Sequence, residues 1–209
     1  ESTKRHLDLS GGDASKRAVE LLDEVHNPGA RQRLDYYPHR YSGGMRQRVM
    51  IAIALSCNPK LLIADEPTTA LDVTVQAGIL DLLDELREQH EMSMIIITHD
   101  MGVVAEAADE IAVMYAGQIV EQASAEELFD HPEHPYTEAL RGALPQLEGE
   151  GVRQSRLTAI SGRPPDLIDL PDCCRLTSRC PYANPSDFCA TNVPELLGNG
   201  AGHHERTAH

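Results

Sequence analysis

The chain has 209 residues, of which 41% are hydrophobic, and it contains no tryptophan. This length allows a sizeable core in one domain with an appendage, and the composition is typical of a globular protein. With 33 acidic against 18 basic residues the formal net charge is −15, which argues against a nucleic-acid groove as the main surface.

The first predicted helix runs from Asp13, a residue type that caps helices, to about Val25. Asn27-Pro28-Gly29 ends it. Further on, Ser42-Gly43-Gly44 precedes a strong helical run from Met45 to about Cys57. Such a loop presents backbone N–H groups and the positive end of a helix dipole, and the glycines allow close approach. This pattern favours an anion-binding site, although a plain helix N-terminus explains it equally.

The apolar run Leu61–Ala64 leads into Asp65, Glu66 and Pro67. The run predicts a buried parallel strand covered on both faces, and Pro67 stops it because proline cannot donate to a sheet ladder. Two acids therefore lie where open α/β sheets bind ligands. Asp65 is suited to hold a divalent cation and Glu66 to orient a water molecule, although an acidic turn after a strand is the simpler interpretation.

A further helix, Val73 to about Gln89, is predicted to begin at the cap Asp72. A second strand, Met92–Thr98, ends at His99. His99 could contact the charged end of a ligand at the same edge of the sheet, and a capping turn explains the residue as well. The predicted fold class is α/β.

The second half of the chain begins with a short helix at 101–109, followed by a hairpin around Ala116-Gly117 and a capping box at Ser124. A Pro/His-rich junction, His131–Thr137, precedes another helix to about Ala143 and a polar linker at 145–156. We place a domain boundary near residue 130, giving regions 1–129 and 130–209.

Taken in order, the Ser-Gly-Gly helix start, the strand into Asp-Glu-Pro, the Ala70-Leu71-Asp72 segment and the strand into Thr-His-Asp resemble the second half of an ATP-binding cassette (ABC) ATPase. The resemblance covers about residues 13–127. It implies the C-terminal part of a P-loop NTPase domain, with ATP and Mg²⁺ as ligands and a second ATPase protomer, identical or different, as partner.

The resemblance also implies roles for the motif residues. Ser42, Gly43 and Gly44 would contact the γ-phosphate of ATP held by the opposite protomer. In the strand motif, Asp65 would serve Mg²⁺ and Glu66 would be the catalytic base. Asp72 would belong to a loop that crosses the dimer interface, and His99 would link the γ-phosphate to the dimer.

The sequence departs from the family pattern in one large respect, because it contains no G-x-x-x-x-G-K-[ST] phosphate-binding loop. The glutamine loop and the adenine-stacking aromatic residue are also missing. Since the chain starts at Glu1 rather than methionine, we interpret it as a fragment or processed piece. Alone, it should neither bind ATP tightly nor hydrolyse it.

The tail resembles the C-terminal extension of oligopeptide and dipeptide importer ATPases, through His134-Pro135-Tyr136-Thr137 and Arg179-Cys180-Pro181-Tyr182. This resemblance implies ATP-driven peptide uptake through two membrane permease subunits, fed by an extracellular peptide-binding protein. The location would be the cytoplasmic face of a prokaryotic plasma membrane. Nickel and sugar importers share the tail, so importers for those substrates are the alternative. A non-catalytic regulatory or metal-binding module is an alternative of another class.

Four of the five cysteines cluster in the tail, at Cys173, Cys174, Cys180 and Cys189. Clustering of this kind indicates a metal or cluster site more than disulfides. Some peptide-importer ATPases carry an iron–sulfur cluster here, and three of these cysteines match that pattern. A [4Fe-4S] cluster, zinc, or no metal at all are the open alternatives.

Basic residues are mostly arginine, and the acid-rich, lysine-poor composition suits a high-salt cytoplasm. A halophilic source and an ordinary acidic protein are both compatible with this pattern.

Overall fold

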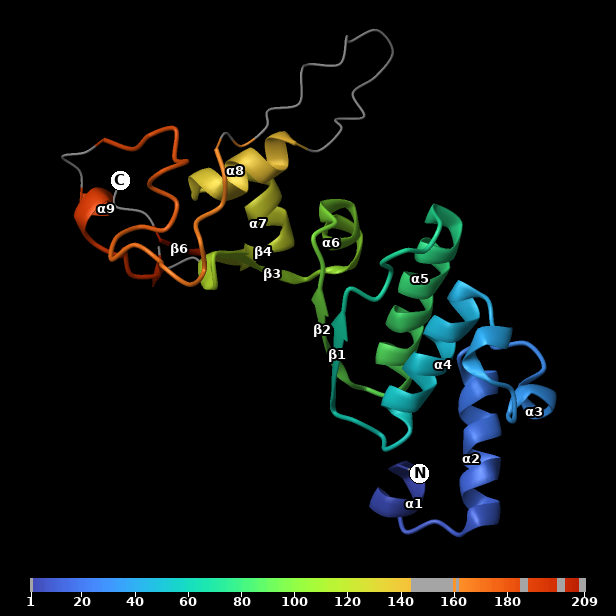
Figure 1. The fold of residues 1–209 in the computed structure, drawn as a ribbon. Helices are drawn as coiled ribbons and strands as arrows, with labels where there is room; N and C mark the ends of the chain where they lie inside the picture. Colours follow the sequence, from blue (N-terminus) through green and yellow to red (C-terminus); the bar gives the residue numbers. More distant parts are fainter. Residues whose placement is uncertain (1, 144–159, 161, 185–187, 199–201, 207–209) are drawn as a thin grey trace, which may run out of the picture. The chain divides into compact units, whose positions relative to one another are not determined.

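The computed structural model describes residues 2–143, 160, 162–184, 188–198 and 202–206 (Figure 1). It divides into two compact units, Glu1–His99 and Asp100–His209. Each unit has its own hydrophobic core. The α/β class is confirmed, because helices and strands alternate along the chain. The domain boundary near residue 130 stays a prediction, because the two compact units do not test where the C-terminal extension begins.

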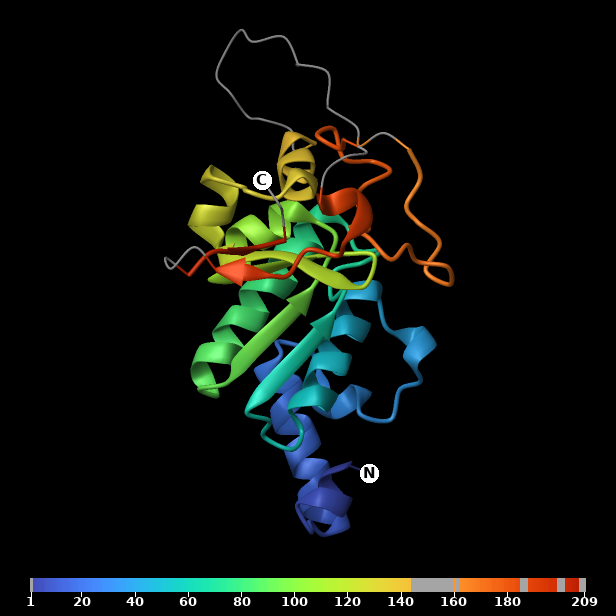
Figure 2. The ribbon, with the colours of Figure 1, turned by 90° about the vertical axis from the view of Figure 1, so that its left-hand side faces the viewer.

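The first unit contains a parallel pair of strands with helices on one side (Figures 1 and 2). Its elements are α1 (Ser2–His6), α2 (Gly11–Glu24), α3 (Ala30–Arg33), the 3₁₀ helix η1 (Pro38–Arg40), α4 (Gly43–Leu55), β1 (Leu61–Asp65), α5 (Val73–Gln89) and β2 (Ser93–Ile97).

Helix α5 illustrates how its cap and its apolar spacing determine a helix of the first unit. Asp72 accepts a hydrogen bond from the Val75 N–H group at 2.9 Å, so the helix begins where the sequence predicts. Its buried side chains recur at helical spacing and join the core, each contributing roughly 1.5–3 kcal/mol of burial free energy. They are Ile79, Leu82, Leu83 and Leu86.

The predicted start of α2 was wrong. Ser10, not Asp13, is the cap: its Oγ accepts the Asp13 N–H at 3.3 Å and donates to the Asp13 carboxylate at 2.6 Å. The acid thus occupies the third position of the helix, and Gly11 and Gly12 enter the helix before it.

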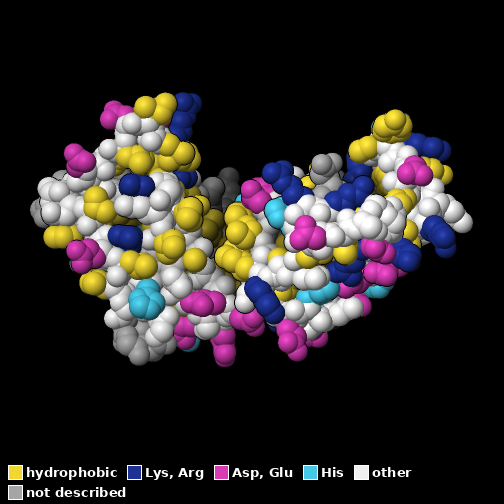
Figure 3. All heavy atoms as spheres, turned by 90° about the horizontal axis from the view of Figure 1, so that it is seen from below, with side chains coloured by type: hydrophobic (Ala, Val, Ile, Leu, Met, Phe, Trp, Pro, Cys, Tyr) yellow, Lys and Arg dark blue, Asp and Glu magenta, His cyan; other side chains and the backbone are white. Residues whose placement is uncertain are grey.

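The prediction that β1 is covered on both faces was also wrong. Leu62 is buried against the helices, but Ile63 is 60% exposed and Ile95, on the neighbouring strand, is 48% exposed. Since side chains alternate along a strand, one face of the pair packs on the helices and the opposite, apolar face is exposed. Figure 3 shows hydrophobic side chains at the surface among the acidic ones.

The second unit is built on the predicted hairpin. Its elements are α6 (Met101–Ala107), β3 (Glu110–Tyr115), β4 (Gln118–Ser124), α7 (Ala125–Asp130), α8 (Pro135–Gly142), α9 (Phe188–Thr191), β5 (Leu197–Gly198) and β6 (His204–Glu205). The strands form one sheet in the order β3-β4-β6-β5. Ala116 and Gly117 make the turn with positive φ angles of 47° and 80°, as a tight hairpin requires.

Short helices cover this sheet. Ser124 caps α7 by accepting the Glu127 N–H group at 3.2 Å, which confirms the cap of the predicted capping box. His134 caps α8 through its imidazole ring. The linker predicted at 145–156 lies outside the described residues. Within the described part of the chain, no helix is both long and apolar enough to cross a membrane.

Candidate functional site

The carboxyl ends of β1 and β2 meet at one edge of the sheet, because the strands are parallel and Asp65 pairs with Ile97. The N–H group of Glu66 donates to the Ile97 carbonyl at 2.8 Å and so extends the ladder by one residue. Asp65 and Glu66 are both exposed at this edge. The acids therefore lie where the sequence predicts a ligand site.

Glu66 lies within hydrogen-bonding distance of two polar side chains, Thr69 and His99. Its Oε1 atom lies 3.1 Å from His99 Nδ1, and its Oε2 atom accepts a hydrogen bond from Thr69 Oγ1 at 2.8 Å. The Glu66 backbone has a φ of 46°, in the left-handed region that non-glycine residues rarely adopt. Such strain is concentrated at functional sites, and here it accompanies the contact of Glu66 with His99.

The surroundings of Glu66 favour its charged form. The hydrogen bonds from Thr69 and then from His99 lower the pKa of the Glu66 carboxyl from its ordinary value. A lowered pKa means that these hydrogen bonds add stability above the unfolded-state pKa and lose it as the pH falls through the folded-state pKa. At neutral pH Glu66 is an acceptor only, as a residue that orients water must be.

Replacing Thr69 by valine should raise the Glu66 pKa towards its ordinary value, because Thr69 contributes the largest lowering. A carbon-13 NMR titration of the Glu66 carboxyl group measures the change. His99→Gln is the comparison, since it removes the second contributor and should raise the pKa less. A larger rise in His99→Gln than in Thr69→Val would contradict the assigned order.

A second cluster is formed by the starts of α4 and α5. Ser42 caps α4, its Oγ accepting the Met45 N–H group at 3.4 Å. Gly43 and Gly44 follow as the first helical residues. A Cβ atom added to Gly44 would lie 2.7 Å from Val75 Cγ1, so glycine is what allows α4 and α5 to approach. The predicted anion-binding loop and the cap Asp72 of α5 therefore belong to one neighbourhood.

Gly44→Ala should destabilise the first unit by about 1–3 kcal/mol, because the new methyl group overlaps Val75. Gly43→Ala is the matched control: its added Cβ would lie 3.4 Å from Leu71, an ordinary contact. Urea unfolding followed by far-ultraviolet circular dichroism compares the two. Equal stability of both variants would show that close helix approach does not depend on Gly44.

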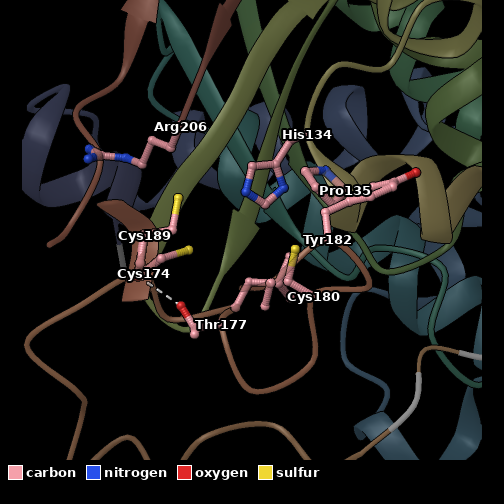
Figure 4. A pocket seen from close by; sticks show the side chains of 10 residues that line it. His134, Pro135, Cys174, Thr177, Cys180, Tyr182, Cys189 and Arg206 are labelled. Carbon is pink, nitrogen blue, oxygen red and sulfur yellow. Dashed lines mark hydrogen bonds between the residues drawn. The ribbon is translucent and has the colours of Figure 1, made fainter. Parts of the chain in front are cut away.

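The cysteine-rich tail forms a small pocket in the second unit (Figure 4). Three of the predicted ligands, Cys174, Cys180 and Cys189, line it together with His134 and other residues. Cys173 is not among the lining residues, and its thiol lies 3.7 Å from the Cys174 carbonyl. Burial raises the pKa of the Cys180 thiol.

The cavity is about 20 Å³, which is room for roughly one water molecule. Among the described residues, no group of three or more His, Cys, Asp or Glu side chains lies close enough together to hold a metal ion. Binding of zinc, which draws its ligands to one point, or of a larger cluster would require this pocket to rearrange.

Sequence reasoning missed a buried polar network beside the pocket. Glu121 of β4 is fully buried and accepts hydrogen bonds from the Glu133 N–H at 2.7 Å and the His134 N–H at 3.1 Å. Its Oε1 atom also lies 2.7 Å from His203 Nε2, and His203 is 1% exposed. The only sequence signal was a glutamate within an apolar-alternating strand, which does not reveal partners 12 and 82 residues away.

His134 links this network to the pocket. Its Nδ1 atom accepts the Tyr136 N–H group at 3.1 Å, and burial lowers the pKa of its imidazole to about 4, against an opposing effect of Glu121. The ring is therefore neutral near pH 7. The His-Pro-Tyr-Thr motif thus caps α8 and joins β4 to the cysteine segment.

Two protein-family models match the sequence. The model described as ABC transporter matches residues 1–69, and the model described as oligopeptide/dipeptide transporter, C-terminal region, matches residues 120–189. Among solved structures, the chain is similar to the dimeric post-hydrolysis ATP-binding cassette MJ0796 bound to ADP and Pi, with a TM-score of 0.49 and 32% sequence identity. The match covers 56% of this chain and 49% of the MJ0796 chain.

Curated relatives match nearly the whole chain. The oligopeptide transport ATP-binding protein AppD of Bacillus subtilis (strain 168) is 54% identical over 197 residues, which is 94% of this chain and 58% of that protein. The dipeptide transport ATP-binding protein DppD of Escherichia coli (strain K12) is 50% identical over 196 residues, again 94% and 58%. This chain therefore spans about three fifths of the length of the relatives it matches. On both family models and these identities, the chain belongs to the ABC transporter family, in the branch with the oligopeptide/dipeptide transporter C-terminal region.

Proposed function

We propose that this chain is part of the ATP-hydrolysing subunit of an importer for oligopeptides or dipeptides. The observation that carries the proposal is the contact of Glu66 with Thr69 and His99 at the carboxyl edge of β1 and β2. The names of the relatives, oligopeptide and dipeptide transport ATP-binding proteins, support the substrate class. Importers of nickel or sugars remain the alternative within the same machinery.

The geometry supports a division of roles at this edge. ATP and Mg²⁺, bound in an assembled ATPase, would supply a polarised γ-phosphate. Glu66, kept ionised by Thr69 and His99, would accept a hydrogen bond from the attacking water and orient it. Asp65, exposed one residue earlier, would hold Mg²⁺ directly or through water. His99 would contact the γ-phosphate from the neighbouring strand end.

The cluster at the starts of α4 and α5 would act on a partner protomer. The start of α4, formed by Ser42, Gly43 and Gly44, would contact the γ-phosphate of ATP held by the second protomer. Asp72 would place the segment before α5 at the dimer interface. In this arrangement, a sequence that contains no phosphate-binding loop would still contribute to hydrolysis.

The remaining partners and the location follow from this role. The subunit would act as a dimer, identical or mixed, beneath two membrane permeases that receive peptide from an extracellular binding protein. Its place would be the cytoplasmic face of the plasma membrane. A non-catalytic regulatory module is the alternative of another class, since no phosphate-binding loop is present in the sequence.

The deciding experiment is ATP turnover by this chain alone and mixed with an ATPase protomer that has an intact phosphate-binding loop. Turnover should be absent for the chain alone and should rise in the mixture. A mixture no faster than the added protomer, with the chain shown to be folded by circular dichroism, would favour the regulatory module.

Metal binding by the tail is a separate proposal. Cys174, Cys180 and Cys189 line one pocket, which supports them as ligands of a [4Fe-4S] cluster or zinc after rearrangement. Cys173 is less suitable as a ligand than these three cysteines, because it does not line the pocket. Iron, sulfide and zinc analysis of anaerobically purified protein tests this, and absence of all three would overturn it.

A further inference from the structure

Backbone hydrogen bonds hold two of the pocket cysteines side by side. The Cys174 N–H group donates to the Cys189 carbonyl at 3.1 Å. Thr177 bridges the same two residues: its N–H group donates to the Cys174 carbonyl at 3.0 Å, and its Oγ1 donates to the Cys189 carbonyl at 3.0 Å. The hydrogen bonds therefore keep the main chains of Cys174 and Cys189 in direct contact, and a disulfide requires two cysteines whose main chains lie close together.

The side chains of this pair enter the same pocket. Figure 4 shows the thiols of Cys174 and Cys189 directed to one part of it, with the Thr177 hydrogen bond beneath them. Both residues are partly exposed, so a small reagent can reach them. None of the five cysteines, all of which lie in the described part of the chain, is in a disulfide.

The other two cysteines of the tail are held differently. Cys180 belongs to a separate turn, its N–H group donating to Leu176 at 2.8 Å and its carbonyl accepting from Ala183 at 3.2 Å. Cys173 does not line the pocket, although it adjoins Cys174 in sequence.

We propose that Cys174 and Cys189 form a redox-active dithiol that peroxide converts to a disulfide when no metal occupies the pocket. One thiol loses its proton, and the thiolate attacks an oxygen of hydrogen peroxide and breaks the O–O bond, giving a sulfenic acid and hydroxide, which takes up the released proton and becomes water. The second thiol then displaces the hydroxyl group, giving the disulfide and a second water. Two electrons pass from the sulfurs to the peroxide. The disulfide fixes the segment between the two residues and removes two of the three pocket thiols, so the oxidised pocket cannot bind a thiolate-ligated metal.

The test oxidises the reduced, metal-free chain with equimolar hydrogen peroxide, blocks remaining thiols with N-ethylmaleimide and maps tryptic peptides by mass spectrometry. Trypsin cleaves after Arg175 and Arg179 and so separates Cys173 and Cys174 from Cys180 and Cys189. Most of the chain should carry a reducible cross-link between these two peptides. Fragmentation of the linked pair from the unmutated chain should assign it to Cys174 and Cys189.

Serine variants provide matched controls. The cross-link should persist in Cys173→Ser and Cys180→Ser and should be lost in Cys174→Ser and Cys189→Ser. In urea, the Cys189→Ser chain should regain a cross-link through Cys180. The fold is what favours the Cys174–Cys189 pair, and unfolding allows any two thiols to meet. A link through Cys173 or Cys180 in the folded, unmutated chain, or sulfenic acid without a link, would overturn the proposal. None of these readouts uses ATP, so the result is independent of the proposed ATPase role.

Discussion

Glu66→Gln should lower ATP turnover by about 10²–10⁴-fold when the chain acts in a dimer that carries phosphate-binding loops. Glutamine preserves the size of the side chain but removes the charge that the Thr69 and His99 hydrogen bonds maintain. ATP binding should persist, because the change removes the group that orients water and leaves the phosphate contacts. Phosphate release and equilibrium nucleotide binding, measured on the same preparation, separate the two effects.

Glu91→Gln is the matched control. Glu91 is also an exposed glutamate with a positive φ, 48°, in a turn of the first unit, but it lies before β2 rather than after a strand's carboxyl end. Its turnover should equal that of the unmodified chain. Unchanged turnover in Glu66→Gln would remove Glu66 from the catalytic role, whereas equal loss in both variants would indicate a general effect of charge.

Glu121→Ala should destabilise the second unit by about 3–5 kcal/mol. The substitution leaves the Glu133 and His134 N–H groups and the His203 ring without their common acceptor, in a site with no exposure to water. The loss should concentrate where β4 meets the C-terminal strand. Hydrogen exchange of the Arg206 amide, which donates to the Val120 carbonyl at 2.9 Å, measures it directly.

Glu110→Ala provides the control for this change. Glu110 is exposed on the same hairpin and accepts a hydrogen bond from Gln122 at 2.7 Å. Its removal should change stability by no more than about 0.5 kcal/mol. Fast exchange of the Arg206 amide in Glu110→Ala, or slow exchange in Glu121→Ala, would contradict a central role for the buried carboxylate.

Local patterns in the sequence predicted several helices, strands and turns, and the edge at which the carboxyl ends of β1 and β2 meet. Four features are each determined within a few residues, and all are confirmed: the cap at Asp72, the helix Val73–Gln89, the turn at Ala116-Gly117 and the helix cap at Ser124. The start of α2 was predicted wrongly because Ser10 and Asp13 are both good capping residues, and only the geometry shows which one caps.

The roles of the site residues depend on contacts that sequence spacing does not supply. Asp65, Glu66 and His99 were expected at one edge because the two strands were expected to be parallel. Thr69 was not singled out, since a threonine in a polar loop has no pattern of its own, yet it makes the shorter hydrogen bond to Glu66.

The sequence by itself determined the order of motifs, the α/β class and the family, because these depend on short segments whose meaning is local. Only the tertiary structure decided which cysteines share a pocket and that Cys173 is outside it. It also revealed that Glu121 and His203, far apart in the chain, form one buried pair. Such pairings depend on which distant segments the tertiary fold brings into contact, and no local period or spacing in the sequence predicts those contacts.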